Sequence, residues 1–443
     1  MLNCAVVYLL NKSHADAKPT TLVIMLTMLL SATTSSYGMS DMTGEKYGIS
    51  DMTVEYLSNP LGVDVSPRFS WKVVPITSGA RGIFVKQSAI TVSHAINQSV
   101  LWTATPTSNA THLVPYTGPT LVSDARYSWK IASTLSDGTV VSSAVGSFGT
   151  ALLDSADWRA TWITGNNSAR LLRTEFSLAS AGYSYATLFI AGIGYHEVQL
   201  NGMKVSDAML EAGWSSFDKR VYYTAHDVGP LLRAGPNALG VSLGNGWWSC
   251  GPAPGSGQPR CSSSPPQLLV QLQVHGVPVV ISSPATWKVH AGPITYDSLY
   301  NGEHYDARIA AALEDWSTTG FDDSAWVAAT AAASSANDAT LASRLFEPVR
   351  HLATFTPRWE RSARPGAQTF DFGQNMAGVV RLSGLRCAAG TVVTLRHAEL
   401  LMHPPCSPQC LEPWPSAAER IAGRISGYSP HVSFGPLLPR WRV

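Results

Sequence analysis

Apolar and polar residues alternate with a period of two along most of the chain, which is the pattern of half-buried β-strands. The alternation is clear around Trp71 and Trp129, which fall on the apolar side and are expected in a core. Residues 197–206 indicate two such strands joined by Asn201-Gly202, a pair that readily adopts the positive φ angles of a tight hairpin turn. No stretch indicates a series of long amphipathic helices. The sequence therefore predicts an all-β fold.

At 443 residues the chain is long enough for several domains, and changes in its pattern divide it into three β modules. The spacing of strands and turns predicts a fibronectin type III-like sandwich, then a jelly-roll sandwich, then a third β-sandwich piece. The predicted boundaries are 1–38 for a targeting segment, 39–52 for a linker, 53–151 for the fibronectin type III-like domain, 152–328 for the jelly roll, 329–343 for a low-complexity linker, 344–402 for the third sandwich and 403–443 for an irregular tail.

The first 38 residues have the pattern of a targeting segment. Lys12 and Lys18 precede an apolar run at 22–30, and small residues follow it. The run suits the core of a signal peptide and is short for a membrane span. Translation from Met25 would cut the run, but secretion is the favoured interpretation, with no membrane attachment after cleavage.

The cysteines are compatible with export. Cys250 and Cys261 bracket a loop rich in proline, glycine and serine and could close it as a disulfide. Cys406 and Cys410 are also close enough to pair. Cys387 would then be left over, and we expect it to be a buried free thiol.

Charge and motifs exclude several classes of function. With 31 basic and 30 acidic residues the net charge is +1, which gives no electrostatic footprint for nucleic acid or an anionic membrane. A neutral ligand fits this balance better than a polyanion. The sequence also lacks a Ser/His/Asp nucleophile motif, a phosphate loop and a zinc spacing, so no metal ligands or catalytic residues are assigned.

One stretch of the predicted jelly roll has the composition of a sugar site. A sugar exposes hydroxyl groups around an apolar face, so its site needs an aromatic platform with polar groups at the rim. Asn245, Trp247 and Trp248 meet this description, and Asn201 lies at a turn that could come near them, so these four are the predicted substrate-binding residues. Because neighbouring residues of a strand face opposite sides, at least one of the two tryptophans is also expected in the core. Asn201 is required by its turn whether or not a ligand exists.

Five strings of residues, in order along nearly the whole chain, carry a family likeness. They are Asn59–Trp71, Leu153–Ile163, residues 195–248, Asn301–Arg308, and Asp371–Gly378 with His397–Leu400. In these strings the chain resembles the N-terminal β modules of bacterial-type α-L-rhamnosidases of glycoside hydrolase family 78.

The resemblance implies a parent enzyme that releases terminal α-L-rhamnose from glycosides with inversion. It implies that the third module is concanavalin-like, and that the acid and base glutamates lie in a following (α/α)6 barrel, which we expect to be missing from these 443 residues. The jelly roll of some relatives is similar to a rhamnose-binding module that uses calcium, so calcium is a candidate ion near Asn201 and Asn245, with Asp207 or a carbonyl near Pro252 as further ligands.

Glycoside hydrolysis needs two carboxyl groups that flank the bond. The family-like strings offer Glu303, Asp306, Asp371 and Glu399, but none falls where the family's catalytic glutamates would lie. We expect Asp306 to pair with Arg308 or cap a turn, and Asp371 and Glu399 to accept hydrogen bonds from loop backbone.

These observations predict a chain that binds carbohydrate or acts as a scaffold, without turnover. Two alternatives stay open. The chain is a stand-alone rhamnose-binding, lectin-like protein, or it is a non-functional truncated fragment.

Overall fold

Strands make up nearly all the regular structure, which confirms the predicted all-β, multi-domain fold. The computed structural model describes residues 6–11, 25–26 and 46–398, apart from gaps at 78–80, 106–108, 166–168, 250–263, 276, 300–301, 333–338, 361–366, 386 and 388–389. Over this part of the chain there is one short α-helix, α1 (Ala307–Ala312), and two 3-10 turns, at Ser155–Asp157 and Gly229–Leu231. No helix among the described residues is long and apolar enough to cross a membrane.

The first module is a sandwich of two antiparallel sheets, with strand orders β3-β4-β7 and β10-β8-β5-β6, and with β9 beside β8. Alternating apolar residues of both sheets meet between them, and Trp71 and Trp129 are each 2% exposed, as predicted for core residues. Its strands are β3 (Tyr47–Val54), β4 (Arg68–Pro75), β5 (Val85–His94), β6 (Val100–Ala104), β7 (Val114–Pro115), β8 (Arg126–Leu135), β9 (Val140–Ser142) and β10 (Gly146–Gly149).

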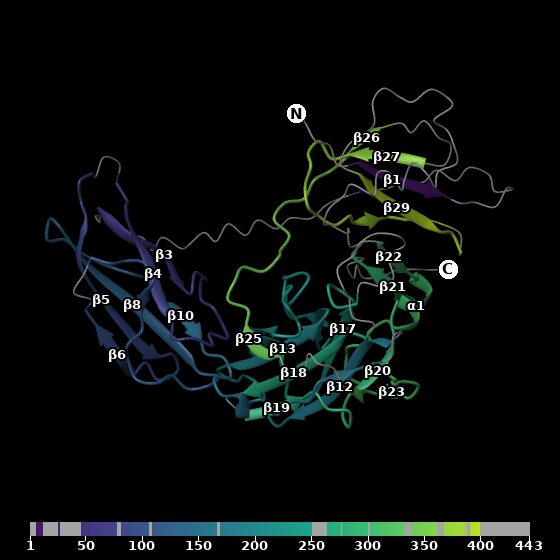
Figure 1. The fold of residues 1–443 in the computed structure, drawn as a ribbon, viewed down its shortest axis with the longest axis horizontal. Coiled ribbons are helices and arrows are strands. Elements are labelled where there is room, and N and C mark those ends of the chain that lie inside the picture. The colour runs from purple at the N-terminus through teal and green to yellow at the C-terminus, as the bar shows by residue number, and fades with distance from the viewer. Residues whose placement is uncertain are drawn as a thin grey trace.

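The second module is a larger sandwich (Figure 1). One sheet has the order β24-β11-β18-β13-β16-β25 with β19 beside β18, the other has the order β15-β14-β17-β12-β20-β23, and β21 and β22 form a separate hairpin that precedes α1. The strands are β11 (Ile163–Thr164), β12 (Ala169–Leu178), β13 (Ala186–Ile193), β14 (Tyr195–Leu200), β15 (Met203–Lys204), β16 (Arg220–Asp227), β17 (Gly235–Gly244), β18 (Gln267–Val274), β19 (Val277–Ile281), β20 (Lys288–Ala291), β21 (Ile294–Ser298), β22 (Gly302–Tyr305), β23 (Val327–Ala328), β24 (Thr330–Ala331) and β25 (Thr340–Ser343).

The core of this module follows from the strand pattern. Leu239, Val241 and Leu243 of β17 project into it, and β13 and β18 are buried along their whole length. The predicted hairpin forms as expected, since Asn201 (φ 53°) and Gly202 (φ 80°) join β14 to β15.

The third module contains a sheet with the order β26-β27-β1-β29. Figure 1 shows β1 between β27 and β29, although these strands lie far apart in the sequence. Two parts of the predicted targeting segment therefore pair with this module as strands, and the rest of residues 1–38 lies outside the described residues. The strands are β1 (Val6–Asn11), β2 (Met25–Leu26), β26 (Arg358–Glu360), β27 (Ala367–Asp371), β28 (Leu382–Ser383), which pairs with β2, and β29 (Val393–Ala398).

The structure describes only one of the predicted cysteine features. Cys387 is exposed, so the expectation of a buried thiol was wrong. The pairs Cys250 with Cys261 and Cys406 with Cys410 lie outside the described residues, and their pairing stays a prediction.

Candidate functional site

The two adjacent tryptophans of the predicted site follow β17 in a tight turn. The backbone N–H groups of Trp248 and Ser249 both donate to the carbonyl oxygen of Asn245, each at 3.1 Å. The turn means that strict strand alternation does not apply to Trp247 and Trp248, and both side chains are half-buried. The expectation that at least one of them lies in the core rested on strand alternation, whereas both pack half-buried against one apolar cluster from this turn.

Asn245 belongs to the buried framework below this turn. Its backbone N–H donates to Asp297 Oδ2 at 2.6 Å, and its side-chain Nδ2 donates to the Asp297 carbonyl at 2.8 Å. Asp297 lies in β21 and also faces Arg170 of β12, with 3.8 Å between the charged atoms. Asn245 is 8% exposed, so it fixes the turn to the β21–β22 hairpin and leaves little of itself for a ligand.

The exposed part of the site is a pair of stacked indole rings. Trp247 stacks on Trp214 with ring centroids 4.8 Å apart and an interplanar angle of 23°, and Trp214 is 64% exposed. Gly213 precedes it with a φ of 103°, a backbone conformation that favours glycine and turns the chain at this point. We refer to Trp214 and Trp247 as the platform. Trp214 was missed among the predicted binding residues, although the Gly213-Trp214 string lies in the same stretch.

Trp248 anchors the platform to the protein. Its Nε1 donates to the carbonyl oxygen of Pro265 at 3.1 Å, and its ring packs edge-on against Phe217 with centroids 5.7 Å apart. Both contacts hold the turn against the apolar cluster on the sheet that contains β13, β16 and β18.

Asn201 lies at the other end of the same strand pair. Tyr195 is opposite Gly244 and Leu200 is opposite Leu239, so the length of β14, about 20 Å, separates Asn201 from the platform. Its Nδ2 donates to the Leu231 carbonyl at 2.9 Å and to Asn237 Oδ1 at 2.8 Å, and its Oδ1 accepts from the Ala238 N–H at 2.9 Å. The structure thus brings Asn245, Trp247 and Trp248 together but leaves Asn201 apart.

One carboxyl group of the family-like strings is strongly perturbed. Glu303 lies directly opposite Asp297 across the β21–β22 hairpin, and burial, with the nearby charge of Asp297, raises its pKa to about 7. A glycosidase needs two carboxyl groups across the glycosidic bond, one with a raised pKa that acts as the acid and one that is ionised. Here, however, Asp297 is 7% exposed and accepts from Asn245, which leaves little room for a glycosidic bond between the two groups.

Asp306 and Asp371 behave as expected. Asp306 accepts from the N–H of Arg308 at the start of α1 and forms an ion pair with the same guanidinium, which lowers the pKa of Asp306 to about 2. Asp371 Oδ1 accepts from the N–H of Gly373 at 2.7 Å. Glu399 lies outside the described residues.

Two of the proposed calcium ligands, Asn201 and Asp207, already have protein partners, whereas Asn245 Oδ1 is buried without a hydrogen-bond partner in the described part of the chain. All polar side-chain atoms of Asn201 have protein partners, and Asp207 Oδ1 accepts from Arg350 Nε at 2.9 Å. Among the described residues no cluster of three or more histidine, cysteine, aspartate or glutamate side chains could hold an ion. Pro252 lies outside them.

Three family profiles match consecutive parts of the chain. They are the Rha78A-like N-terminal immunoglobulin domain at 49–154, the alpha-L-rhamnosidase N-terminal domain at 182–353, and the bacterial alpha-L-rhamnosidase concanavalin-like domain at 361–412.

Individual relatives agree with these profiles. An alpha-L-rhamnosidase of Streptomyces avermitilis is 37% identical over 238 residues, which is 53% of this chain and 22% of the relative. One from Formosa agariphila is 31% identical over 371 residues, which is 74% of this chain and 38% of the relative. The solved alpha-L-rhamnosidase of Dictyoglumus thermophilum superposes with a TM-score of 0.64 at 30% identity, over 74% of this chain and 39% of that one. A Streptomyces avermitilis structure with L-rhamnose shares the fold, with a TM-score of 0.65 at 22% identity over 74% of this chain and 49% of that one.

The fold thus defines a multi-module β-sandwich protein whose second module presents an exposed aromatic pair. The chain belongs to the bacterial-type α-L-rhamnosidases of glycoside hydrolase family 78, of which it carries the N-terminal β modules. It spans well under half the length of the curated relatives it matches.

Proposed function

We propose that this chain is the carbohydrate-binding, non-catalytic portion of an α-L-rhamnosidase, and that the platform holds terminal α-L-rhamnose of glycosides. The observation that carries the proposal is the 64% exposure of Trp214 on a ring stack fixed by buried contacts. A pyranose ring has an apolar face that packs on such a surface, while its hydroxyl groups stay in water or reach the rim. The curated relatives are named alpha-L-rhamnosidases, and one related solved structure holds L-rhamnose, which supports rhamnose as the sugar.

Two measurements test this proposal. Calorimetric titration with methyl α-L-rhamnopyranoside should give saturable heat, and Trp214→Ala should weaken binding about 10-fold to 100-fold because it removes the packing surface. Phe84→Ala is the matched control, since Phe84 is 60% exposed in the first module and should leave the affinity unchanged. Equal affinities of the wild type and Trp214→Ala would contradict the platform.

Turnover is the second measurement. Incubation of the purified chain with an aryl α-L-rhamnoside should release no aglycone at an enzymatic rate, because Asp306 and Asp371 are held by Arg308 and by backbone, and Glu303 faces a buried Asp297 with little room for a glycosidic bond. Release at such a rate would refute the non-catalytic assignment.

We also infer secretion from the predicted targeting segment. Mass spectrometry of the exported protein should find a mature N-terminus near residue 38 or beyond it. A retained N-terminus would instead favour the pairing of Val6–Asn11 with the third module.

A further inference from the structure

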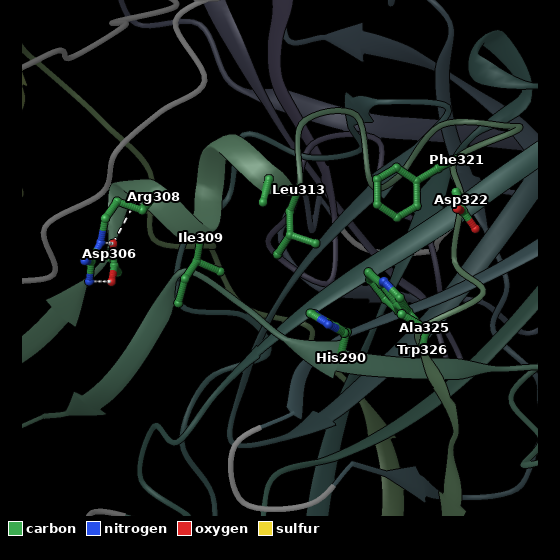
Figure 2. Close-up of a pocket in the computed structure, with 10 residues that line it drawn as sticks. His290, Asp306, Arg308, Ile309, Leu313, Phe321, Asp322, Ala325 and Trp326 are labelled. Atoms are coloured by element: carbon green, nitrogen blue, oxygen red, sulfur yellow. Dashed lines mark hydrogen bonds and ion pairs between the residues drawn. The ribbon is translucent and has the colours of Figure 1, made fainter. Parts of the chain in front are cut away.

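A second aromatic feature of the same module is a cleft beside α1. It lies between α1 and residues 321–326, and its cavity volume is about 620 Å³. Figure 2 shows Ile309 and Leu313 on one side, and Phe321, Trp326 and His290 on the other. Pockets of a few hundred to a thousand cubic ångströms are typical of small-ligand sites.

The aromatic side of the cleft is a continuous ring stack. The indole of Trp326 stacks on His290, with centroids 5.1 Å apart at 22°, and on Trp316, with centroids 6.0 Å apart at 20°. Phe321 packs edge-on against Trp326 at 6.0 Å and 75°. Trp326 is 7% exposed, so its neighbours hold it in place and its accessible edge has a fixed orientation.

Arg173 braces the loop that carries these rings. It is 1% exposed, its Nε donates to the Trp316 carbonyl at 2.9 Å, and its Nη2 donates to the Thr318 carbonyl at 3.0 Å. It also forms ion pairs with Asp323 and Glu175. A wall supported in this way is preorganised, so a ligand need not order the loop when it binds.

Charged groups lie at the rim of the cleft. On the α1 side Arg308 forms a two-pronged ion pair with Asp306, with Nε to Oδ1 at 2.9 Å and Nη2 to Oδ2 at 2.6 Å. On the other side Asp322 is exposed, and its Oδ1 accepts from the Ser324 N–H at 3.0 Å. One cation and two anions give no excess of positive charge, which disfavours phosphate or carboxylate ligands and suits a neutral polyol.

The aliphatic side of the cleft further restricts which substituents of the polyol can face it. Ile309, Ala312 and Leu313 offer no hydrogen-bonding side chain. A methyl group at carbon 6 of a sugar packs well there, whereas a hydroxymethyl group would bury a hydroxyl without a partner.

We propose that this cleft is a second carbohydrate site, which takes the pyranose ring of a 6-deoxyhexoside with its methyl group toward Ile309, Ala312 and Leu313 and its hydroxyl groups toward the charged rim of Asp306, Arg308 and Asp322. The choice of L-rhamnose as the test sugar rests on the proposed function. The site itself rests on the cleft and is independent of the platform.

The experiment uses the full chain with Trp214→Ala as background, which removes the platform. Methyl α-L-rhamnopyranoside should still bind this protein, and Ala312→Arg should weaken the remaining affinity at least about ten-fold, because the long side chain fills the cleft. Ala311→Arg is the matched control, since Ala311 is an exposed neighbour in α1 that does not line the cleft. It should leave the affinity unchanged. Methyl α-L-mannopyranoside, which differs only by the hydroxyl at carbon 6, should bind at least about ten-fold more weakly.

Three results would overturn the second site. They are no saturable binding in the Trp214→Ala background, equal losses for Ala312→Arg and Ala311→Arg, and equal affinity for the two sugars. Failure of the platform is distinguishable, because then Trp214→Ala binds as the wild type does while Ala312→Arg abolishes all binding.

Discussion

The second module holds its tryptophans in two contrasting ways. At the platform, Trp214 is 64% exposed and rests on Trp247, whose turn is fixed to β21 by Asn245 and Asp297. At the cleft, Trp326 is 7% exposed and is enclosed by other rings on a loop that Arg173 braces. The platform thus offers a flat surface that is already exposed in the free protein, and the cleft offers an open recess between α1 and residues 321–326.

The comparison shows that a polar residue beside a tryptophan can support a site without contacting the ligand. Asn245 and Arg173 both lie close to a tryptophan, yet the N–H groups of Asn245 and the guanidinium of Arg173 donate to the protein. Because buried polar groups need partners, such residues set the position of a site and need not touch its ligand. Loss of these supports should therefore affect stability first, and loss of Trp214 should affect binding alone.

The largest expected effect is that of Arg173→Met. It leaves the carbonyl groups of Trp316 and Thr318 without their donor and removes one charge partner of Asp323. Breaking such a buried network costs about 3–5 kcal/mol. Denaturant-dependent hydrogen exchange of second-module peptides would measure the loss in the free energy of unfolding.

A matched control for this change is Arg308→Met, which alters an exposed arginine of the same cleft. It should shift the free energy of unfolding by less than about 0.5 kcal/mol. Equal losses for the two variants would show that Arg173 is not a support, and the contrast between cleft and platform would lose its basis.

A smaller effect is expected for Asn201→Ala. The variant loses three buried hydrogen bonds and places alanine at a φ of 53°, which together should cost about 2–4 kcal/mol. Asn201→Gly loses the same bonds without the backbone strain, so its loss should be smaller by about 1 kcal/mol. Both variants should bind methyl α-L-rhamnopyranoside as the wild type does, since about 20 Å separates Asn201 from the platform. A loss of sugar affinity in either variant would show that Asn201 takes part in sugar binding.

The sequence predicted those parts of the fold that depend on local pattern. Strand alternation located the core positions Trp71 and Trp129, and the Asn201-Gly202 pair located the hairpin turn. These features depend on the alternation of side chains along a strand and on the backbone preferences of turn residues. Both are determined by residues that are neighbours in the sequence.

The candidate site was harder to predict because its members come from distant segments. Trp214 meets Trp247 across 33 positions of sequence, and Asn245 meets Asp297 across 52. Asn201 and Asn245 both lie at turns of one strand pair, but the register places them at opposite ends. Such long-range pairings follow from the closure of the sandwich, which local alternation does not specify.

The pH dependence of stability offers a further test, because Glu303 lies opposite Asp297, which holds the turn of the platform. The folded state raises the pKa of Glu303 from its ordinary value of 4.5 to about 7, so its protonated form favours folding. Its contribution is fully present below pH 4.5 and is lost as the pH rises through about 7. Relative to the wild type, Glu303→Gln should therefore become more stable between pH 4.5 and 7, by about 1–2 kcal/mol after allowance for partial solvation. A difference in the free energy of unfolding that stays constant with pH would contradict the burial of this carboxyl.

The smallest expected effect is that of Trp214→Ala on stability. Because most of the Trp214 surface is already in water, its removal should change the free energy of unfolding by less than about 0.5 kcal/mol, even though sugar binding falls. Trp326→Ala provides the comparison, since it empties a buried ring position and should cost about 3–5 kcal/mol. Thermal and urea unfolding of both variants beside the sugar titration would separate the two quantities. If Trp214→Ala destabilised the module as much as Trp326→Ala does, the exposed ring would be a structural element, and the platform would differ from the cleft only in its degree of exposure.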